Sequence, residues 1–360
     1  MSQDRSLADR QLSQPREFNV LRSLLTPSLL LGLAGFLSPS VAAGDDAPKP
    51  LRVGIIGLDT SHVVAFTKVL NAPDAKGDLA GLRVVAAYPG GSPDVASSRD
   101  RVEGFTRQLR DDFKVEIVGS VGALLEKVDV VLLESVDGRK HLEQAEPVLK
   151  AHKPVFIDKP FAGSLADAVR IYQLVQQTGT PCFSSSSLRY SPSIAKLKGD
   201  PKVGEVIGCD AYGPCPVEEH HPDLFWYGVH GVEALFTVMG PGCVSVSRVR
   251  TDGTELVTGT WEGDRVGTFR GIRRGKADYG VLAFGTKGVA LGQGSGGYDP
   301  LIMEIGKFFR TGQPPVSVRE TLEIFAFMEA ADESKRRGGA PVTLESVLSR
   351  AGATSAAAPR

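Results

Sequence analysis

The chain has 360 residues, 42% of them hydrophobic and 23% charged, which is the composition of a globular protein large enough to form two domains. Its formal net charge is -1 at pH 7, so basic residues are not in excess. Nucleic-acid binding depends on clustered Lys and Arg that displace counterions from the phosphates. Nucleic acid is therefore excluded as the expected partner.

The first 43 residues have the three-part pattern of an export signal. Arg16 and Arg22 precede an apolar run over 29–37, which the small-residue site Val41-Ala42-Ala43 follows. The apolar run contains glycines and is too short to span a bilayer of about 30 Å, so we expect no stable membrane anchor. We expect cleavage before Gly44 and a mature protein in the periplasm or outside the cell.

After a linker at 44–50, strands of buried type alternate with amphipathic helices. Strands are predicted over 51–57, 82–88, 115–118, 128–134, 154–157 and 181–185, and helices over 60–70, 121–126, 141–151 and 165–177. Such alternation requires right-handed crossovers between parallel strands. The sequence therefore predicts an α/β Rossmann-type domain with a doubly wound parallel sheet.

The pattern then changes to successive short strands separated by Gly-rich or Asp-Gly turns. They are predicted over 206–212, 244–251, 255–261, 265–271, 279–284 and 289–291, with helices over 225–239, 301–309 and 318–335. This run predicts an α+β domain with an open, mainly antiparallel sheet. The expected organisation is a signal peptide (1–43), a linker (44–50), a Rossmann-type dinucleotide-binding domain (51–163), an α+β substrate and oligomerisation domain (164–346) and a disordered tail (347–360).

Four cysteines, an even number, occur in a chain that we expect to be exported. They are Cys182, Cys209, Cys215 and Cys243, and no two of them form a Cys-x-x-Cys motif. The spacing assigns no disulfide pairing, and we expect at least two of them to be buried thiols.

Short motifs occur in a defined order along the two predicted domains. Asp158-Lys159-Pro160 follows the fifth strand, Arg189-Tyr190-Ser191-Pro192 comes after the sixth, and Gly228-Val229-His230 lies in the helix of the second half. Together with Pro341-Val342-Thr343-Leu344 near the end, this order resembles the Gfo/Idh/MocA family of glucose-fructose oxidoreductase and inositol dehydrogenase. The resemblance extends over about 51–344. In that family the first motif is Glu-Lys-Pro and the helix carries the catalytic histidine.

The resemblance implies an oxidoreductase that uses NAD or NADP and acts on a sugar or polyol. Lys159 would contact the substrate oxygen and the nicotinamide ribose, and His230 would exchange the hydroxyl proton as hydride moves. A secondary alcohol cannot lose hydride unless its proton also leaves, and a positioned imidazole accepts a proton near neutral pH. Read without the family, Lys159 is equally a solvated loop lysine and His230 a hydrogen-bonded core histidine.

The remaining site residues are also implied by position in the family. Cofactor contacts are expected at Gly57, Leu58, Asp59, Thr60, Ser61, His62, Glu134, Ser135, Asp158 and Lys159. Substrate contacts are expected at Arg189, Tyr190, Trp226 and Tyr227. On its own chemistry, Arg189 suits a structural ion pair as well as it suits a substrate clamp.

Three positions depart from the family pattern. The loop Gly57-Leu58-Asp59-Thr60-Ser61-His62 keeps only the first glycine of Gly-x-Gly-x-x-Gly, and Asp59 puts a carboxylate where the pyrophosphate should rest on the helix N-terminus. No acidic residue ends the second strand at 82–88, where an acceptor for the adenosine ribose is expected, although Ser92 or Asp94 follows. Trp226 stands where relatives commonly carry an aspartate before the histidine. Phosphate binding is therefore expected to be weakened or rearranged.

Two other classes of function remain open. One is a redox-neutral, metal-assisted carbohydrate lyase or hydrolase, since imidazoles and carboxylates gather at the metal candidates His220, His221, Asp223 and Glu233. The other is a non-catalytic sugar-binding protein that uses Phe225, Trp226 and Tyr227, of which at least one should be core. Because an open sheet leaves one face exposed, we expect a homo-oligomer, a dimer or a tetramer.

Overall fold

The computed structural model describes residues 49–353. The predicted signal peptide at 1–43 and most of the linker at 44–50 lie outside these residues. Within residues 49–353, no helix is long and apolar enough to cross a membrane.

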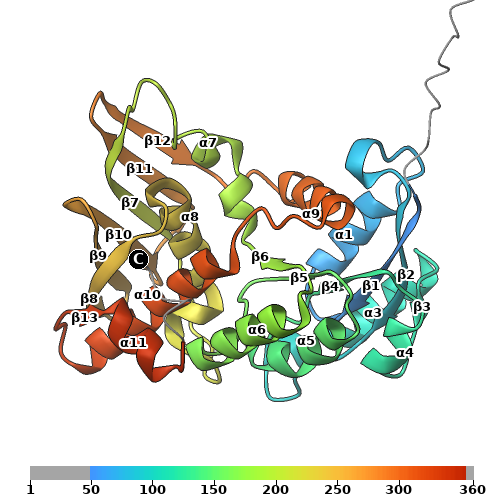
Figure 1. The fold of residues 1–360 in the computed structure, drawn as a ribbon. Helices are drawn as coiled ribbons and strands as arrows, with labels where there is room; N and C mark the ends of the chain where they lie inside the picture. The colour runs from blue at the N-terminus through green and yellow to red at the C-terminus, as the bar shows by residue number, and fades with distance from the viewer. Residues whose placement is uncertain (1–48, 354–360) are drawn as a thin grey trace, which may run out of the picture. The chain divides into compact units, whose positions relative to one another are not determined.

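The N-terminal part is a six-stranded parallel sheet with helices on both faces (Figure 1). Its strands follow the order β3-β2-β1-β4-β5-β6. From β1 the chain adds strands toward one edge of the sheet, and from β4 it adds them toward the other edge. The strands are β1 (Leu51–Ile56), β2 (Leu82–Tyr88), β3 (Glu116–Ile117), β4 (Val130–Leu133), β5 (Val155–Ile157) and β6 (Cys182–Ser184). The helices are α1 (His62–Leu70), α2 (Ala96–Arg99), α3 (Val102–Asp111), α4 (Val121–Leu125), α5 (His141–Lys150) and α6 (Leu165–Thr178). The predicted Rossmann-type fold is confirmed.

The predicted domain boundary after residue 163 is wrong. β6 pairs in parallel with β5, with Phe183 opposite Phe156, and α6 packs beside α5. Their hydrogen bonds and buried apolar side chains therefore complete the first sheet. The Rossmann-type domain extends to about residue 186.

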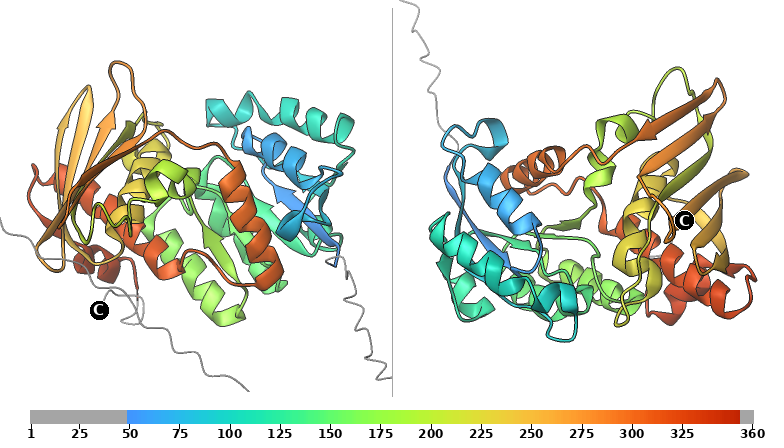
Figure 2. Two further views of the ribbon diagram at one scale, coloured as in Figure 1. Left: turned by 90° about the horizontal axis from the view of Figure 1, so that it is seen from above. Right: turned by 180° about the vertical axis from the view of Figure 1, so that it is seen from behind.

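The second sheet has seven strands and is antiparallel except where β7 and β10 run in parallel (Figure 2). It follows the order β12-β11-β7-β10-β9-β8-β13. The strands are β7 (Val206–Pro214), β8 (Cys243–Thr251), β9 (Thr254–Trp261), β10 (Arg265–Ile272), β11 (Gly280–Gly285), β12 (Val289–Gln293) and β13 (Val342–Thr343). The helices of this part of the chain are α7 (Pro192–Ala195), α8 (Val229–Met239), α9 (Asp299–Thr311), α10 (Val318–Arg336) and α11 (Leu344–Arg350).

Helix α9 returns to the first domain after the strands of the second sheet. Its apolar face, including Leu301, Ile305 and Phe308, belongs to the same buried cluster as Phe66 and Phe183. The rings of Phe308 and Phe183 meet edge to face with centroids 4.8 Å apart. In Figure 1, α9 lies beside α1, and contacts between the two helices agree with that view. The core of the Rossmann-type domain therefore includes residues that come more than a hundred positions later.

The prediction that a disordered tail begins at residue 347 is wrong, because the helix α11 extends past this position. Residues 344–350 form α11, which packs on α10 and β8, and Val347 and Leu348 are buried. The apolar pair on one helix face explains this order, although the surrounding composition is Ala-rich and polar. Residues 354–360 lie outside the described part of the chain.

All four cysteines are free and buried, as expected for at least two of them. Burial raises the pKa of the Cys215 thiol to about 11, and it raises the pKa of the other three thiols as well. These thiols are therefore protonated, apolar packing groups near neutral pH.

A buried arginine joins three elements on the inner face of the second sheet. The Arg248 guanidinium donates from Nε to Glu255 at 2.6 Å and from Nη2 to Asp223 at 2.8 Å, and it also pairs with Asp332 on α10. Lys335 donates to the same Asp223 carboxylate at 2.6 Å. This network fixes the start of the π-helical turn Leu224–Gly228, which leads directly into α8.

Candidate active site

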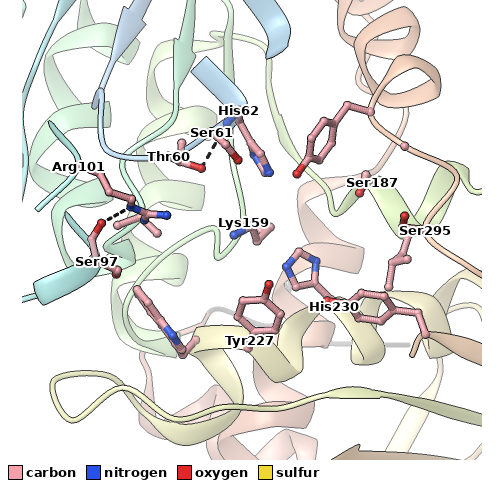
Figure 3. Close-up of a pocket in the computed structure, with 16 residues that line it drawn as sticks. Thr60, Ser61, His62, Ser97, Arg101, Lys159, Ser187, Tyr227, His230 and Ser295 are labelled. Atoms are coloured by element: carbon pink, nitrogen blue, oxygen red, sulfur yellow. Dashed lines mark hydrogen bonds between the residues drawn. The ribbon is translucent and has the colours of Figure 1, made fainter. Parts of the chain in front are cut away.

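A cavity of about 540 Å³ lies at the carboxyl end of the parallel sheet, where the two parts of residues 49–353 meet (Figure 3). From the first domain it is lined by Thr60, Ser61, His62, Ser97, Arg101, Val136 and Lys159. From the later part of the chain it is lined by Ser187, Leu188, Trp226, Tyr227, His230, Tyr279, Ser295, Gly297 and Tyr298. A ligand pocket at this position is typical of doubly wound α/β folds.

The loop after β1 keeps its first glycine for a steric reason. Gly57 has φ +88°, and a Cβ there would lie 2.3 Å from Oγ of Ser135. The next two residues, Leu58 and Asp59, are fully buried. None of these three predicted cofactor contacts lines the cavity, because the loop packs against the segment after β4 at this point.

Asp59 points away from the cavity. Its carboxylate accepts a hydrogen bond from the Val136 amide at 2.9 Å and another from Oγ of Ser98 at 2.6 Å. Burial raises the pKa of Asp59, although both hydrogen bonds favour the ionised form. The carboxylate therefore links the segments after β1, β2 and β4. It does not face the cavity, where the sequence suggested that it would repel a phosphate.

Helix α1 begins at His62 without a side-chain cap. Ser61 is the N-cap residue, but its side chain makes no capping hydrogen bond. Thr60 Oγ1 accepts only a long hydrogen bond of 3.4 Å from the His62 amide. Thr60, Ser61 and His62 all face the cavity, so the positive end of this helix is directed toward a ligand.

The polar side chains after β2 pair with residues of the segment after β4. Ser92 donates to Asp137 at 2.7 Å, and Asp94 pairs with Arg139 at 2.9 Å. Neither Ser92 nor Asp94 lines the cavity. Asp137 also accepts from Nε2 of His221 at 2.9 Å, which ties this end of the cleft to the loop before α8.

Two carboxylates lie together beneath the floor of the cavity. Glu134 follows β4 and is fully buried, and neither of its oxygens has a hydrogen-bond partner among the described residues. Burial and the nearby charge of Asp158 raise the pKa of Glu134 well above its ordinary value. Ser135, its neighbour, donates to Gln144 at 2.8 Å and is buried. Both positions were expected to touch the cofactor, and both lie behind the cavity surface.

Asp158 is held by the histidine of α1. Nδ1 of His62 lies 2.8 Å from Oδ2 of Asp158 and 3.8 Å from Oε2 of Glu134. Burial acts to raise the pKa of Asp158, but the His62 imidazole and the Lys159 ammonium group outweigh it and hold that pKa at about 2. The first residue of the Asp-Lys-Pro motif is thus a buried anion next to a half-buried lysine.

Lys159 and His230 face the same space from opposite sides. Figure 3 shows Lys159 at the centre of the cavity, with His62 on one side and His230 on the other. Nδ1 of His230 lies 2.8 Å from Oγ of Ser186, which fixes the orientation of the ring. Burial and the charge of Lys159 lower the pKa of His230 well below its usual value. The imidazole is therefore neutral at pH 7 and ready to accept a proton.

Aromatic rings line the remaining walls. Tyr227 and Tyr279 both meet the His230 ring edge to face, with centroids 5.2 and 5.9 Å away. Trp226 packs at a tilt against His221 and also lines the cavity, whereas Phe225 is core, as expected for at least one of these three aromatics. Arg101, Tyr279 and Tyr298 were not predicted, because they lie in short connections directly before α3, β11 and α9 that carry no motif.

Arg189 and Tyr190 do not line the cavity, contrary to their expected role in substrate binding. Arg189 donates to Glu233 at 2.6 Å and pairs with Glu320 at 2.8 Å. Its side chain is only 12% exposed and its charge is fully matched by two carboxylates. The ion pair joins the segment before α7 to α8 and α10, so the structural alternative for Arg189 is the correct one.

The four predicted metal candidates do not meet. His220 is exposed and lies against Glu218, and His221 is buried on Asp137. Asp223 belongs to the Arg248 network, and Glu233 holds Arg189. Each candidate thus has its own partner, and the described residues place His62, Glu134 and Asp158 together instead.

Residues 51–186 match the model of the Gfo/Idh/MocA family, which is described as an oxidoreductase family with an NAD-binding Rossmann fold. These residues belong to that family. The match confirms the predicted class, an NAD(P)-dependent oxidoreductase, and the predicted cofactor class. Its end at residue 186 also agrees with the corrected domain boundary. No curated protein matches the chain.

Solved structures extend the likeness of fold over the second domain. A "probable dehydrogenase" from Thermotoga maritima is 21% identical with a TM-score of 0.68, and the match covers 82% of this chain and 100% of that one. The scyllo-inositol dehydrogenase from Lactobacillus casei with bound NAD(H) and scyllo-inositol is 15% identical with a TM-score of 0.67, covering 82% and 100%. At these identities the likeness is one of fold.

The cavity fits a dinucleotide with a rearranged phosphate contact. Lys159 and His230 are available at the reacting end. At the other end, the glycines that normally admit the pyrophosphate are absent, but Thr60 and Ser61 at the start of α1 face the cavity, and Arg101 lines the same side of it. A guanidinium group and a helix N-terminus both favour phosphate oxygens. Arg101 thus supplies the positive charge at the place where the loop sequence departs from the family.

Replacing Arg101 should weaken dinucleotide binding. We expect Arg101→Gln to raise the dissociation constant for NADH or NADPH about tenfold or more, because a hydrogen bond to a charged group is lost. Titration with nicotinamide fluorescence measures the effect. Arg99→Gln is the matched control, since Arg99 is exposed on the same segment and pairs with Asp100. Equal affinity of the Arg101 variant and the wild type would show that the phosphates lie elsewhere.

Proposed function

We propose that the protein oxidises a secondary hydroxyl of a sugar or polyol, or reduces the corresponding ketone, with NAD or NADP. The observation that carries this proposal is the facing pair Lys159 and His230 in a cavity of the NAD-binding fold. When bound, the nicotinamide accepts or provides the hydride. The residues of this chain provide the acid–base chemistry and hold the substrate.

His230 is suited to take the hydroxyl proton. Because its pKa is lowered, its neutral form persists to pH values where an ordinary histidine is already charged. Ser186 holds the ring through Nδ1 and so orients the imidazole. The imidazole would take the O–H proton of the substrate as the substrate carbon gives up hydride, so that a carbonyl would remain.

Lys159 is suited to stabilise the oxygen that loses this proton. Its ammonium group lies in the cavity between His62 and His230, where a positive charge favours an oxygen that becomes negative. Tyr227, Tyr279 and the indole of Trp226 provide aromatic surfaces on which a sugar ring packs, and Ser187 and Ser295 add hydroxyl groups at the rim. The non-catalytic sugar-binding alternative would use the same walls but give no turnover.

The pH profile of the reaction tests the role of His230. We expect the rate of alcohol oxidation to stay near its maximum down to pH 6.5 and to fall only at lower pH, because the imidazole must be neutral to accept the proton and its pKa is lowered. Production of NADH or NADPH on a panel of polyols and sugars measures this rate. His230→Gln should lose about 100- to 10,000-fold in kcat and the acid limb with it. An acid limb at pH 7 or above would contradict the proposal.

We also propose that the protein is a homo-oligomer that associates through the outer face of the second sheet. Val249, Val266, Val289 and Leu291 are 47–66% exposed on β8, β10 and β12, and such an apolar face is typical of an interface.

Light scattering on the purified protein should give a mass of two or four subunits. Val266→Lys should shift it toward the monomer, because a charge would be desolvated in the interface. Val217→Lys, at an equally exposed position before α8, is the control. A wild-type protein that is monomeric at micromolar concentration would contradict this proposal.

We further propose that the mature protein acts outside the cytoplasm, on the strength of the signal pattern at 1–43. Cell fractionation followed by mass spectrometry of the intact chain should find the protein in the periplasm or medium with Gly44 as its first residue. Full-length chain in the cytoplasm that still begins at residue 1 or 2 would contradict the proposal.

A further inference from the structure

We propose that His62, Glu134 and Asp158 form a binding site for one divalent transition-metal ion at the floor of the cavity. One imidazole and two carboxylates offer ligand atoms that all lie within 4.8 Å of one another. The proposal stands on these three residues and does not depend on hydride transfer.

The topology of the sheet brings the three residues together. His62 begins the helix after β1, Glu134 follows β4 and Asp158 follows β5, and these three strands are neighbours in the sheet. Their carboxyl ends therefore meet at one point of the sheet edge. His62 stands where the third glycine of a dinucleotide loop would be, so an imidazole occupies space that a glycine leaves empty.

The distances fit a first coordination shell. Metal–ligand bonds of about 2.0–2.2 Å separate neighbouring ligand atoms by about 2.8–3.6 Å, depending on whether the angle between them is octahedral or tetrahedral. Nδ1 of His62 lies 2.8 Å from the Asp158 oxygen and 3.8 Å from the Glu134 oxygen. Small side-chain adjustments would place all three atoms on one ion.

The unmatched polar atoms point to a cation. Both oxygens of Glu134 and Oδ1 of Asp158 are buried without a hydrogen-bond partner among residues 49–353, and the two side chains are 0% and 2% exposed. Buried carboxylates are normally hydrogen-bonded, paired or bound to a metal. Glu134 and Asp158 together have four carboxylate oxygens, and His62 contacts one of them. The other three have no hydrogen-bond partner among the described residues.

The mixed ligand set indicates which ions the site would bind, and the position of His62 indicates where the free coordination positions face. One nitrogen and two carboxylates suit Zn²⁺, Mn²⁺ or Fe²⁺ better than Ca²⁺, which prefers oxygen alone. The ring of His62 is held in place by Phe66, at 5.5 Å between centroids, and by Tyr298, at 4.6 Å. Since His62 lines the cavity and the two carboxylates lie beneath it, the free coordination positions face the ligand space. They would take a hydroxyl or carboxylate oxygen of a sugar or sugar acid.

Metal uptake by the purified mature protein tests the site. Protein prepared without a nickel column is treated with a chelator, desalted and supplied with Zn²⁺, Mn²⁺ or Co²⁺. We expect about one tightly bound ion per chain by elemental analysis. The thermal midpoint should rise by about 5–10 °C with saturating ion, and Co²⁺ should give visible absorption bands.

Variants distinguish this site from adventitious surface binding. Glu134→Gln is isosteric and replaces one carboxyl oxygen by an amide nitrogen, so it should fold and have an unchanged circular dichroism spectrum while losing the bound ion and the midpoint shift. His62→Gln should lose the Co²⁺ spectrum in the same way. His220→Gln is the control, because His220 is an exposed histidine beside Glu218, and it should keep the full stoichiometry.

Two results would overturn the proposal. One is uptake below about a tenth of an ion per chain by the wild type with all three metals. The other is a Glu134 variant that binds as much ion as the wild type. NADH titration of the same samples reports on the dinucleotide independently, so the metal site and the proposed hydride transfer stand or fall separately.

Discussion

The crevice between β1 and β4 is the constraint on which the rest of this structure depends. The connections after β1 and β4 run toward opposite edges of the sheet, so the loops at the carboxyl ends of these two strands leave a space between them. A ligand space results from the chain path alone. This protein places in that space a set of charged groups that a glycine-rich loop would not accommodate, and their desolvation determines the chemistry of the site.

The unusual residues of the loop after β1 have different consequences. Asp59 points into the protein, and its carboxylate accepts hydrogen bonds from the segments after β2 and β4. His62 points the other way and brings an imidazole to buried carboxylates. Of the two glycine positions that this loop has lost, Asp59 therefore has a structural role and His62 changes the floor of the cavity.

Much of the fold was predictable because its elements have strong local signals. The strand at 82–88 was predicted with its observed bounds, since apolar residues fill it and turn residues follow it. Helix α11 was missed because two buried residues, Val347 and Leu348, are a weak signal within an Ala-rich segment. The boundary near 163 was misplaced because the change in pattern was assigned to the motif after β5, whereas the pairing of β6 decides where the sheet ends.

The candidate site was only partly predictable, because charge pairing is a property of three-dimensional neighbours. Lys159, His230 and the aromatic pair Trp226 and Tyr227 were found from motifs and do line the cavity. Arg189 looks the same in sequence whether it faces a ligand or Glu233. Glu134 ends an apolar strand, and nothing local reveals that its carboxylate is buried beside that of Asp158.

The return of α9 to the first domain has a consequence for how this protein is made. The segment that matches the family model ends at residue 186, but the faces of Phe66 and Phe183 are covered by residues of α9, after residue 298. The N-terminal half is therefore not an autonomous folding unit. Its apolar surface stays uncovered until α9, which follows the strands β7 to β12 in the chain, packs on it, so the two domains must complete their cores together.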